Sequence, residues 1–237
     1  MKKLSVCVLF GGISPEHEVS LRSAEAVLNN MDSSKYHILP VGITKSGDWI
    51  LFGGTDYSML PDGTWQEHPG NRRATISPVR GQGLICFEGD CVVRQHVDVV
   101  FPVLHGENGE DGAMQGLLQM AGIPYVGPHI SASAVAMDKT LTKLVVDTTD
   151  VPQAQWLLVR TQDAENRMDR VIEQVEETDA NKKGILPSIT SFLVSIDPTS
   201  DQNMSIYCII FVLHCQAFDI IIKPMIGGGT VSAHFYL

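Results

Sequence analysis

The first 43 residues contain a pattern that few folds can satisfy. Residues 6–10 (VCVLF) form a short, continuously apolar run, which is typical of a strand buried on both faces. The glycine pair at 11–12 ends this run, and apolar residues then recur at helical spacing between 21 and 31. Residues 37–43 (HILPVGI) read as a second strand. A strand, a glycine turn, a helix and a second strand predict an α/β fold built on a parallel sheet.

The helix of this unit has a start signal in the sequence. Ser14 is a typical N-cap residue, and Pro15 suits the first helical position because it has no backbone N–H to leave unpaired. Glu16 then places an acid in the first turn, where the helix dipole favours it. The sequence therefore predicts that this helix begins at Ser14.

Beyond residue 43 the sequence predicts hairpin or loop decoration, followed by further elements of a parallel sheet. Short strand candidates between turns rich in Gly, Pro and Asp lie at 48–52, 84–87 and 91–94. The elements expected after them are a buried strand at 97–104, a helix at 113–121 closed by Gly122, a short strand at 124–127 and one helix from about 131 to 146. We expect a domain boundary near Pro128, giving domains 1–128 and 129–237.

The sequence changes character after about residue 160. A charged, helix-compatible segment is followed by residues 184–222, which are rich in Ser, Ile and Cys without clear alternation. Only residues 220–232 (IIIKPMIGGGTVS) look like organised α/β sequence again. A structureless stretch of this length is unusual inside a compact domain, so it suggests an inserted, foreign or erroneous segment.

Composition excludes several classes of partner. The formal net charge of −10 and the lack of a Lys/Arg cluster argue against nucleic acid and anionic membranes, and favour a small-molecule partner. The five cysteines include no CxxC pair, so we expect reduced thiols in a cytoplasmic protein rather than a disulfide framework or a zinc site. The longest apolar stretch, 205–215, is too short to span a bilayer.

Two glycine-bearing loops follow predicted parallel strands. Residues 10–20 read FGGISPEHEVS, and residues 104–112 read LHGENGEDG. Because loops that leave the carboxyl ends of parallel strands meet at one edge of a sheet, we expect both loops to face one pocket. Neither loop has the GxGxxG pattern, which excludes dinucleotide binding.

Each polar residue of these loops has a structural alternative. Glu16 could serve only the helix dipole, and His105 could be a core histidine bonded to the backbone. Glu110 and Asp111 could simply cap the following helix. Metal ligation by these residues is possible, but no HxH, HxxxH or DxD spacing supports it.

Two lysines are candidates for phosphate binding. Lys223 lies in an apolar strand and precedes a proline and a glycine-rich turn, so its ammonium would sit beside exposed backbone N–H groups. The turn is not a Walker A loop, which would need GxxxxGK[ST]. Lys139 could be an ordinary solvated helix lysine, but a nucleotide held by a strand lysine and a glycine loop makes it a second candidate.

Three segments together resemble the D-alanine-D-alanine ligase family, including its D-alanine-D-serine and D-alanine-D-lactate variants. They are FGGISPEHEVSLRSA, VFPVLHGENGEDGAMQGLLQMAGIPYVGP and SASAVAMDKTLTK, and the match runs in order from about residue 4 to about 160. The resemblance implies an N-terminal preATP-grasp (Rossmann-like) α/β domain, followed here by an incomplete ATP-grasp central domain. It implies D-alanine and ATP as substrates, Mg²⁺ as cofactor, and dipeptide synthesis for peptidoglycan.

The resemblance also assigns residues to the first substrate. Glu16 would fix the ammonium of the first D-alanine, and His105 matches the family histidine near that substrate; both are catalytic candidates. Val19 and Gly106 would join them in binding substrate, with Gly106 allowing close backbone approach. Glu110 would orient the loop of His105 from behind.

Lys139 and Lys223 match family lysines that hold ATP phosphates, but the later part of the chain departs from the family pattern. The interval between them is far longer than usual, and the excess falls in 184–222. The serine and tyrosine loop near the second substrate, the arginine that supports the acyl phosphate and the magnesium ligands have no counterpart here. No metal ligand is therefore assigned.

Three functions follow as hypotheses. The leading one is a D-alanine-D-alanine ligase-type chain, truncated or altered after about residue 180, with little or no ligase activity by itself. The alternative is a non-catalytic D-alanine-binding or regulatory module derived from the ligase. A preATP-grasp domain of another carboxylate-amine ligase is disfavoured by the HGENGEDG and EHEVS pair. The family resemblance also suggests a homodimer formed through the N-terminal domain.

Overall fold

The computed structural model describes residues 3–153, 156–159, 166–180, 193–195, 207–214, 217–224 and 231–236. The chain forms two compact units, Met1–Met137 and Asp138–Leu237, and each unit has its own sheet. Helix α3 (Ile130–Met137) belongs to the first unit, because a Cβ on Gly112 would lie 3.0 Å from the Ile130 carbonyl oxygen. The expected domain boundary near Pro128 precedes this helix and stays a prediction.

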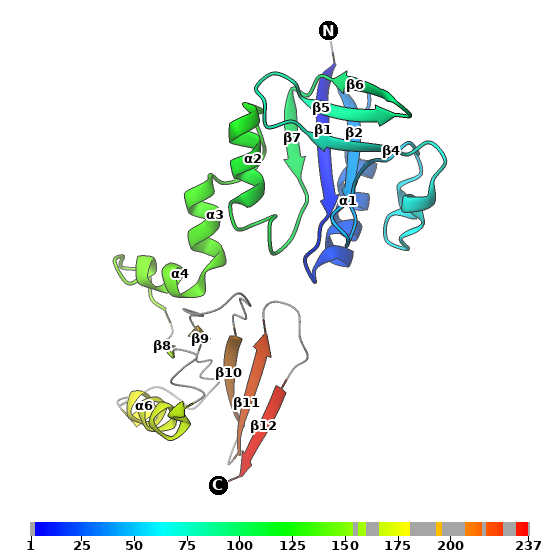
Figure 1. The fold of residues 1–237 in the computed structure, drawn as a ribbon. Helices are drawn as coiled ribbons and strands as arrows, with labels where there is room; N and C mark the ends of the chain where they lie inside the picture. The colour runs from blue at the N-terminus through cyan, green and yellow to red at the C-terminus, as the bar shows by residue number, and fades with distance from the viewer. Residues whose placement is uncertain are drawn as a thin grey trace. The chain divides into compact units, whose positions relative to one another are not determined.

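Seven strands form the sheet of the first unit, in the order β6-β5-β4-β3-β2-β1-β7 (Figure 1). They are β1 (Leu4–Gly11), β2 (Tyr36–Ile43), β3 (Trp49–Leu51), β4 (Arg72–Ile76), β5 (Leu84–Glu88), β6 (Cys91–Gln95) and β7 (Val99–Pro102). β1 pairs in parallel with β2 and with β7, which confirms the predicted parallel core. From β2 to β6 each pairing is antiparallel, so the expected decoration extends the same sheet.

β1 is buried on both faces, as its continuous apolar run predicted. Val6, Val8 and Phe10 point into one core cluster, which includes Leu21 and Leu28 of α1 (His17–Asn30). Cys7 and Leu9 point into the other cluster, together with Leu118 and Met114 of α2 (Ala113–Ala121). Each fully buried large apolar side chain stabilises the fold by about 1.5 to 3 kcal/mol. Helices therefore cover both faces of the parallel strands, and α1 and α2 are fixed on opposite sides of β1.

The helix at 113–121 lies where the sequence predicted it, but the helix expected from 131 to 146 is wrong. The chain forms α3 and then α4 (Lys139–Val146), with a break at Asp138. Asp138 has an extended backbone, and its Oδ1 accepts hydrogen bonds from Thr140 N at 2.8 Å and Leu141 N at 3.0 Å. An aspartate that caps a helix in this way starts a new helix rather than continuing the old one.

Two further predictions of the sequence need correction, and one strand was missed. The buried strand expected at 97–104 is shorter, Val99–Pro102, and the expected strand at 124–127 is an isolated bridge between Val100 and Tyr125. β4 was not predicted, although its inward residues Ala74 and Ile76 alternate with less buried ones. Short strands give few alternating positions, so periodicity defines their ends poorly.

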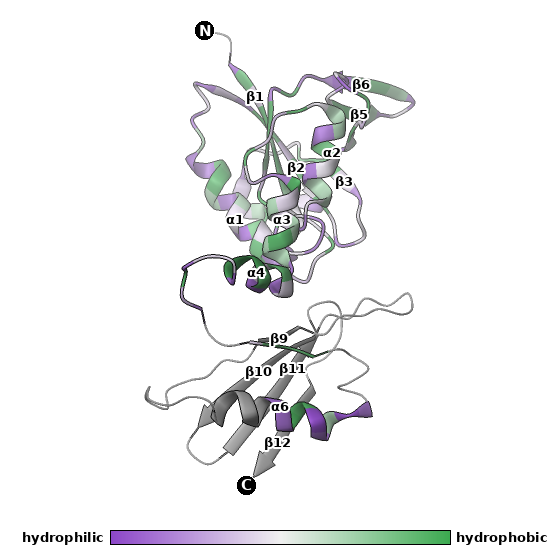
Figure 2. Cartoon of the chain, turned by 90° about the vertical axis from the view of Figure 1, so that its left-hand side faces the viewer, coloured by the Kyte–Doolittle hydropathy of each residue, from purple (hydrophilic) through white to green (hydrophobic). Residues whose placement is uncertain are grey.

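The second unit contains a five-stranded sheet in the order β12-β11-β10-β9-β8. Its elements after α4 are β8 (Leu157–Leu158), α6 (Met168–Ala180), β9 (Leu193–Ser195), β10 (Tyr207–His214), β11 (Ala217–Pro224) and β12 (Val231–Tyr236). β8 pairs in parallel with β9, and the other pairs are antiparallel. In the described part of α6, hydrophilic and hydrophobic residues are mixed (Figure 2), and the helix lies in the segment that the sequence predicted to be charged and helix-compatible.

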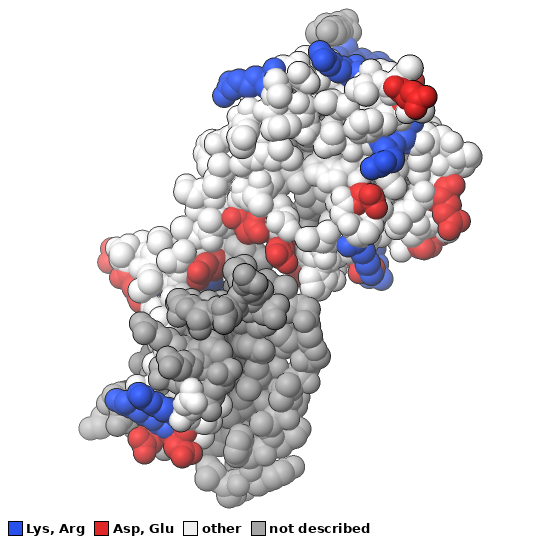
Figure 3. Space-filling view, viewed as in Figure 1, with Lys and Arg blue, Asp and Glu red and all other residues white. Residues whose placement is uncertain are grey.

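Charged side chains are dispersed over the face of the first unit that Figure 3 shows. On the face in Figure 3, acidic and basic groups of the first unit are scattered among uncharged residues. Among the described helices, none combines the length and apolar content needed to cross a bilayer. Cys7, Cys86 and Cys91 of the first unit form no disulfide within the described residues.

Candidate functional site

The first loop of the site begins with a tight turn at the carboxyl end of β1. Gly11 and Gly12 have φ values of +85° and +98°, a region that side chains other than glycine rarely adopt. A Cβ on Gly11 would also lie 2.2 Å from the Ile43 carbonyl oxygen, which accepts a hydrogen bond from Gly12 N at 2.8 Å. The glycine pair thus lets the chain turn directly against the end of β2.

The helix α1 starts later than the sequence predicted. Its first helical residue is His17, and its N-cap is Glu16, whose side chain makes no capping hydrogen bond. The prediction of Ser14 as N-cap is wrong, since Ser14 Oγ accepts a hydrogen bond from Glu16 N at 3.0 Å within the preceding turn. His17 is buried and its Nδ1 lies 2.6 Å from the Gly12 carbonyl oxygen, so Nδ1 carries the proton. The Glu16 carboxylate is left available to the site.

The second loop follows β7 and packs directly against the first. Gly106 has φ of +71°, and a Cβ there would lie 2.4 Å from Ser14 Oγ and 3.4 Å from Glu16 Oε2. Gly106 N donates to Glu110 Oε2 at 2.7 Å, and the Gly106 carbonyl accepts from Glu110 N at 2.9 Å. These contacts confirm that the two loops meet at one edge of the sheet. They also explain why position 106 needs a glycine: one loop packs closely on the other there. The sequence did not predict this reason.

Asp111 has a separate role at the end of this loop. Its carboxylate accepts hydrogen bonds from Asn108 N at 2.8 Å and from Ala113 N, at the start of α2, at 3.0 Å. The N-cap of α2 is Gly112, so the interpretation of Asp111 as the cap is wrong by one position, although its carboxylate does bond the first helical residue. Glu110 differs, because its carboxylate turns back to the loop backbone instead.

Glu16, His105 and Glu110 form a compact cluster of ionisable groups. One ligand-capable atom from each lies within 4.8 Å of the others. His105 Nδ1 lies 3.9 Å from Glu110 Oε1, and the His105 side chain is 31% exposed. The convergence of the two loops agrees with the expectation from sheet topology, since the residues come from loops far apart in the sequence that follow neighbouring parallel strands. Two carboxylates beside a half-buried imidazole attract a cation, whether an ammonium group or a metal ion.

Two serines of α1 hold the second loop, and neither was singled out from the sequence. Ser20 is fully buried; its Oγ accepts from Gly11 N at 2.8 Å and donates to the Val103 carbonyl at 2.5 Å. Ser23 Oγ lies 3.1 Å from His105 Nε2. The spacing from Glu16 to Ser20 and Ser23 is four and then three residues, which puts all three on one helix face. That polar face was the signal that could have identified them.

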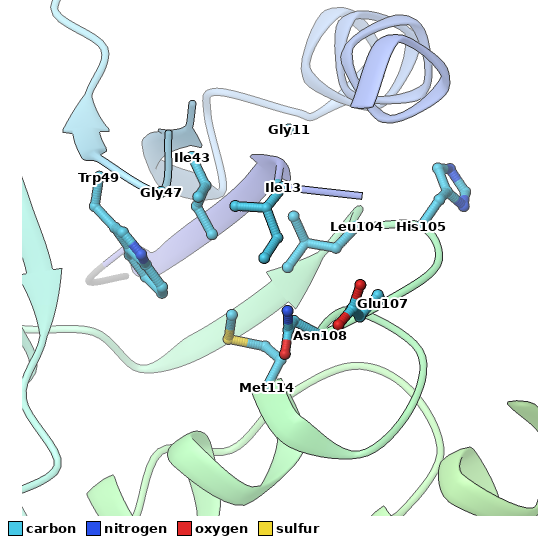
Figure 4. A pocket seen from close by; sticks show the side chains of 12 residues that line it. Gly11, Ile13, Ile43, Gly47, Trp49, Leu104, His105, Glu107, Asn108 and Met114 are labelled. Carbon is cyan, nitrogen blue, oxygen red and sulfur yellow. The ribbon is translucent and has the colours of Figure 1, made fainter. Parts of the chain in front are cut away.

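An apolar pocket of about 200 Å³ lies beside the cluster. Figure 4 shows the side chains of Ile13, Leu104, Met114 and Trp49 around it, whereas the His105 ring points away from them. Neither Glu16 nor Glu110 lines this pocket. The charged cluster and the apolar pocket are therefore neighbouring features that share His105.

The remaining candidate residues lie elsewhere. Val19 is on α1 and is 51% exposed. Lys139 is the first residue of α4 and is partly buried, and Lys223 lies in β11. Both lysines belong to the second unit, and the side chain of Lys223 lies outside the described residues. The structure therefore brings together Glu16, His105 and Gly106, while the substrate role of Val19 and the pairing of the two lysines stay predictions.

Comparison with known proteins identifies this arrangement. A family model described as "D-ala D-ala ligase N-terminus" matches residues 5–128, more than half of the chain. The D-alanine--D-alanine ligase of Caldicellulosiruptor bescii is 38% identical over 204 residues, which cover 86% of this chain and 55% of that protein. The crystal structure of the VanG D-Ala:D-Ser ligase from Enterococcus faecalis is 34% identical, with a TM-score of 0.63 over 77% of this chain and 50% of that one.

A third relative bears on the unusual segment. The D-alanine--D-alanine ligase of Acetivibrio thermocellus is 34% identical over an aligned span that covers 97% of this chain and 64% of that protein. That span includes residues 184–222, which the composition had suggested to be inserted or foreign. The chain spans about half the length of the relatives it matches.

The fold and the two neighbouring loops define the class of protein to which the chain belongs. The α/β sheet with its N-terminal parallel core is that of ATP-grasp ligases. Within that class, the match over residues 5–128 shows that the chain belongs to the D-alanine-D-alanine ligase family.

Proposed function

We propose that the first unit is the D-alanine-binding part of a cytoplasmic D-alanine-D-alanine ligase that makes the dipeptide for peptidoglycan. The observation that carries the proposal is the convergence of Glu16, His105 and Glu110 within 4.8 Å at the edge of the parallel strands. D-alanine at neutral pH carries an ammonium and a carboxylate about one carbon apart. A site for it needs an anion and a group that interacts with a carboxylate side by side.

Each residue has a defined part in this proposal. The Glu16 carboxylate, which is not used for helix capping, binds the ammonium of the first D-alanine through a charge-assisted hydrogen bond. His105 faces the same molecule near its carboxylate. Glu110 holds the His105 loop in place through Gly106 N, and Val19 and Gly106 complete the substrate surface.

The reaction implied by the family has two steps. A carboxylate oxygen of the first D-alanine attacks the γ-phosphorus of ATP, and ADP leaves. The amine of a second D-alanine then attacks the acyl carbon, losing a proton, and inorganic phosphate leaves. D-serine and D-lactate are the alternative second substrates. Lys139 and Lys223 would hold the ATP phosphates, since their positive charge offsets the charge that develops during transfer. Mg²⁺ is the family cofactor, and we assign no ligand to it in this chain.

D-alanine binding to the full chain tests the proposal by calorimetric titration, with L-alanine as the matched ligand control and a chelator present to exclude metal-mediated binding. Glu16→Gln should weaken D-alanine binding about tenfold or more, because a hydrogen bond to a charged group is lost. Glu25→Gln, on the same helix, should leave the affinity unchanged. Failure of the parent chain to bind D-alanine would refute the proposal.

Phosphate release separates the ligase from the alternative binding module. The sequence predicts that this chain alone releases little or no phosphate from ATP when D-alanine is added. D-alanine binding without phosphate release is the outcome expected of this chain, and it is equally compatible with the alternative, a non-catalytic D-alanine-binding module. D-alanine-dependent release, measured by a coupled phosphate assay, would instead contradict the predicted inactivity and favour a working ligase. The suggested homodimer is tested separately by sedimentation of the same chain.

A further inference from the structure

The ring of His105 lies between two polar groups that come from different elements. Its Nε2 is 3.1 Å from Ser23 Oγ on α1, and its Nδ1 is 3.9 Å from Oε1 of Glu110 on its own loop. The other carboxylate oxygen of Glu110 is already bonded to Gly106 N at 2.7 Å, so this side chain is fixed in place. The imidazole therefore has a defined polar neighbour at each nitrogen.

The chemistry of these neighbours favours one tautomer of a neutral imidazole. An ionised carboxylate only accepts hydrogen bonds, so the nitrogen that faces Glu110 is favoured to carry the proton. The proton on Nδ1 leaves Nε2 with a lone pair, and a serine hydroxyl can donate to that lone pair. A serine hydroxyl can donate or accept, so Ser23 does not select the tautomer directly. It is at hydrogen-bonding distance, which Glu110 is not, and it therefore holds the ring in the orientation in which Nδ1 faces the Glu110 carboxylate.

The helix that carries Ser23 is itself tied to the loop of His105. One turn earlier on the same face, Ser20 donates to the Val103 carbonyl at 2.5 Å. At the helix start, Glu16 Oε2 lies 3.4 Å from where a Cβ on Gly106 would be. The face of α1 thus contacts the second loop before, at and after His105. A hydroxyl held on this rigid face fixes the ring more firmly than a group on a loop would.

We propose that Ser23 is a positioning residue of the substrate site, which sets the orientation and, through it, the tautomer of His105. The inference rests on the proposed D-alanine site for its functional consequence, but its structural part stands without any ligand. Ser23 touches neither reacting atom; it acts through His105. Because the hydroxyl makes the contact, Ser23→Thr should keep the positioning of His105 and Ser23→Ala should lose it.

The direct test is nitrogen NMR of the histidine rings in the full chain, because ring ¹⁵N shifts report the tautomer. The chain has eight histidines, so the His105 signals are assigned from their loss in His105→Gln. We expect the parent to be protonated at Nδ1, Ser23→Ala to give a mixture of tautomers, and Ser23→Thr to restore the parent signals. Alanine has the higher helix propensity, so the alanine variant should fold. Ser58→Ala, which removes an exposed hydroxyl bonded to Asp56, is the matched control and should change nothing.

Affinity for D-alanine is the second readout. Ser23→Ala should weaken binding about three- to tenfold, the change that one neutral hydrogen bond supplies, while Ser23→Thr and Ser58→Ala keep the parent affinity. Unchanged His105 signals in Ser23→Ala would overturn the inference, and so would unchanged affinity in a parent that binds D-alanine. If the parent binds no D-alanine while Ser23→Ala still alters the His105 signals, the proposed function fails and the positioning of His105 by Ser23 stands.

Discussion

Replacing Ser20 with alanine would remove one hydroxyl from the point where the ends of β1, α1 and β7 meet. The hydroxyl is fully buried, accepts from Gly11 N at 2.8 Å and donates to the Val103 carbonyl at 2.5 Å. Alanine is a better helix former than serine, so α1 itself is not weakened. The loss falls on the two backbone groups, which stay buried without this partner.

The expected cost follows from those two groups. A buried donor or acceptor that loses its partner costs about 1 to 3 kcal/mol. Since Ser20→Ala affects one of each, we expect the free energy of unfolding of the first unit to fall by about 2 to 6 kcal/mol. A domain has a total stability of about 5 to 15 kcal/mol, so this is a large fraction of it.

Urea unfolding followed by tryptophan fluorescence measures this change. Trp65 is completely buried in the first unit, whereas Trp156 lies in the second, so the experiment uses a Trp156→Phe background. Ser34→Ala is the control, because it removes an exposed hydroxyl bonded to Asp32 and should cost less than about 0.5 kcal/mol. The urea dependence should keep its slope, as the surface exposed on unfolding is unchanged.

A loss below about 0.5 kcal/mol for Ser20→Ala would refute the reasoning, because it would match an exposed substitution. The Gly11 amide and the Val103 carbonyl would then have found other partners. Ser20 would then contribute little to holding the two loops together.

Three further outcomes are expected. Gly106→Ala should lower D-alanine affinity at least tenfold in the calorimetric titration, because the residue has φ of +71° and its new Cβ would overlap the first loop; an affinity equal to the parent's would contradict the packing. Burial raises the pKa of the Cys7 thiol, so peptide mapping after iodoacetamide should find Cys91 alkylated first and Cys7 protected in the folded chain; equal labelling would be inconsistent with this. The hydrogen bond from Lys45 lowers the pKa of the Glu18 carboxyl, so the pair stabilises the fold above the ordinary Glu pKa, and this stabilisation is lost as pH falls through the lowered pKa. Lys45→Met should therefore raise the Glu18 pKa in an NMR titration. An unchanged pKa would refute the pairing.

The parallel core of the fold could be predicted from sequence, for a physical reason. A strand buried on both faces needs apolar side chains at every position, and residues 6–10 have them. The helix at 113–121 was equally clear, since Gly122 in the left-handed conformation closes it. These signals are local and belong to single elements.

The missed features depend on competition between local signals or on contacts distant in sequence. Asp138 could continue a helix or cap a new one, and its capping geometry decides the break. Glu16 and His105 were expected at one edge because sheet topology determines where loops end. Ser23 was missed because its partner, His105, is distant in the sequence, and local sequence patterns do not predict hydrogen bonds between distant residues.

The position of β7 in the sheet has a consequence for the order in which the site is built. β1 and β2 are joined by a single helix. Among the described strands, β7, which comes from much later in the chain, pairs with β1 alone, beside an isolated bridge to Tyr125. Because closing a longer loop costs more entropy, the βαβ half that carries Glu16 should gain amide protection during refolding before residues 104–111 do. Pulsed hydrogen exchange would detect that order, and simultaneous protection would contradict it. The imidazole half of the site then depends on the docking of a sheet-edge strand, so opening at that edge would dismantle the site while most of the core remains folded.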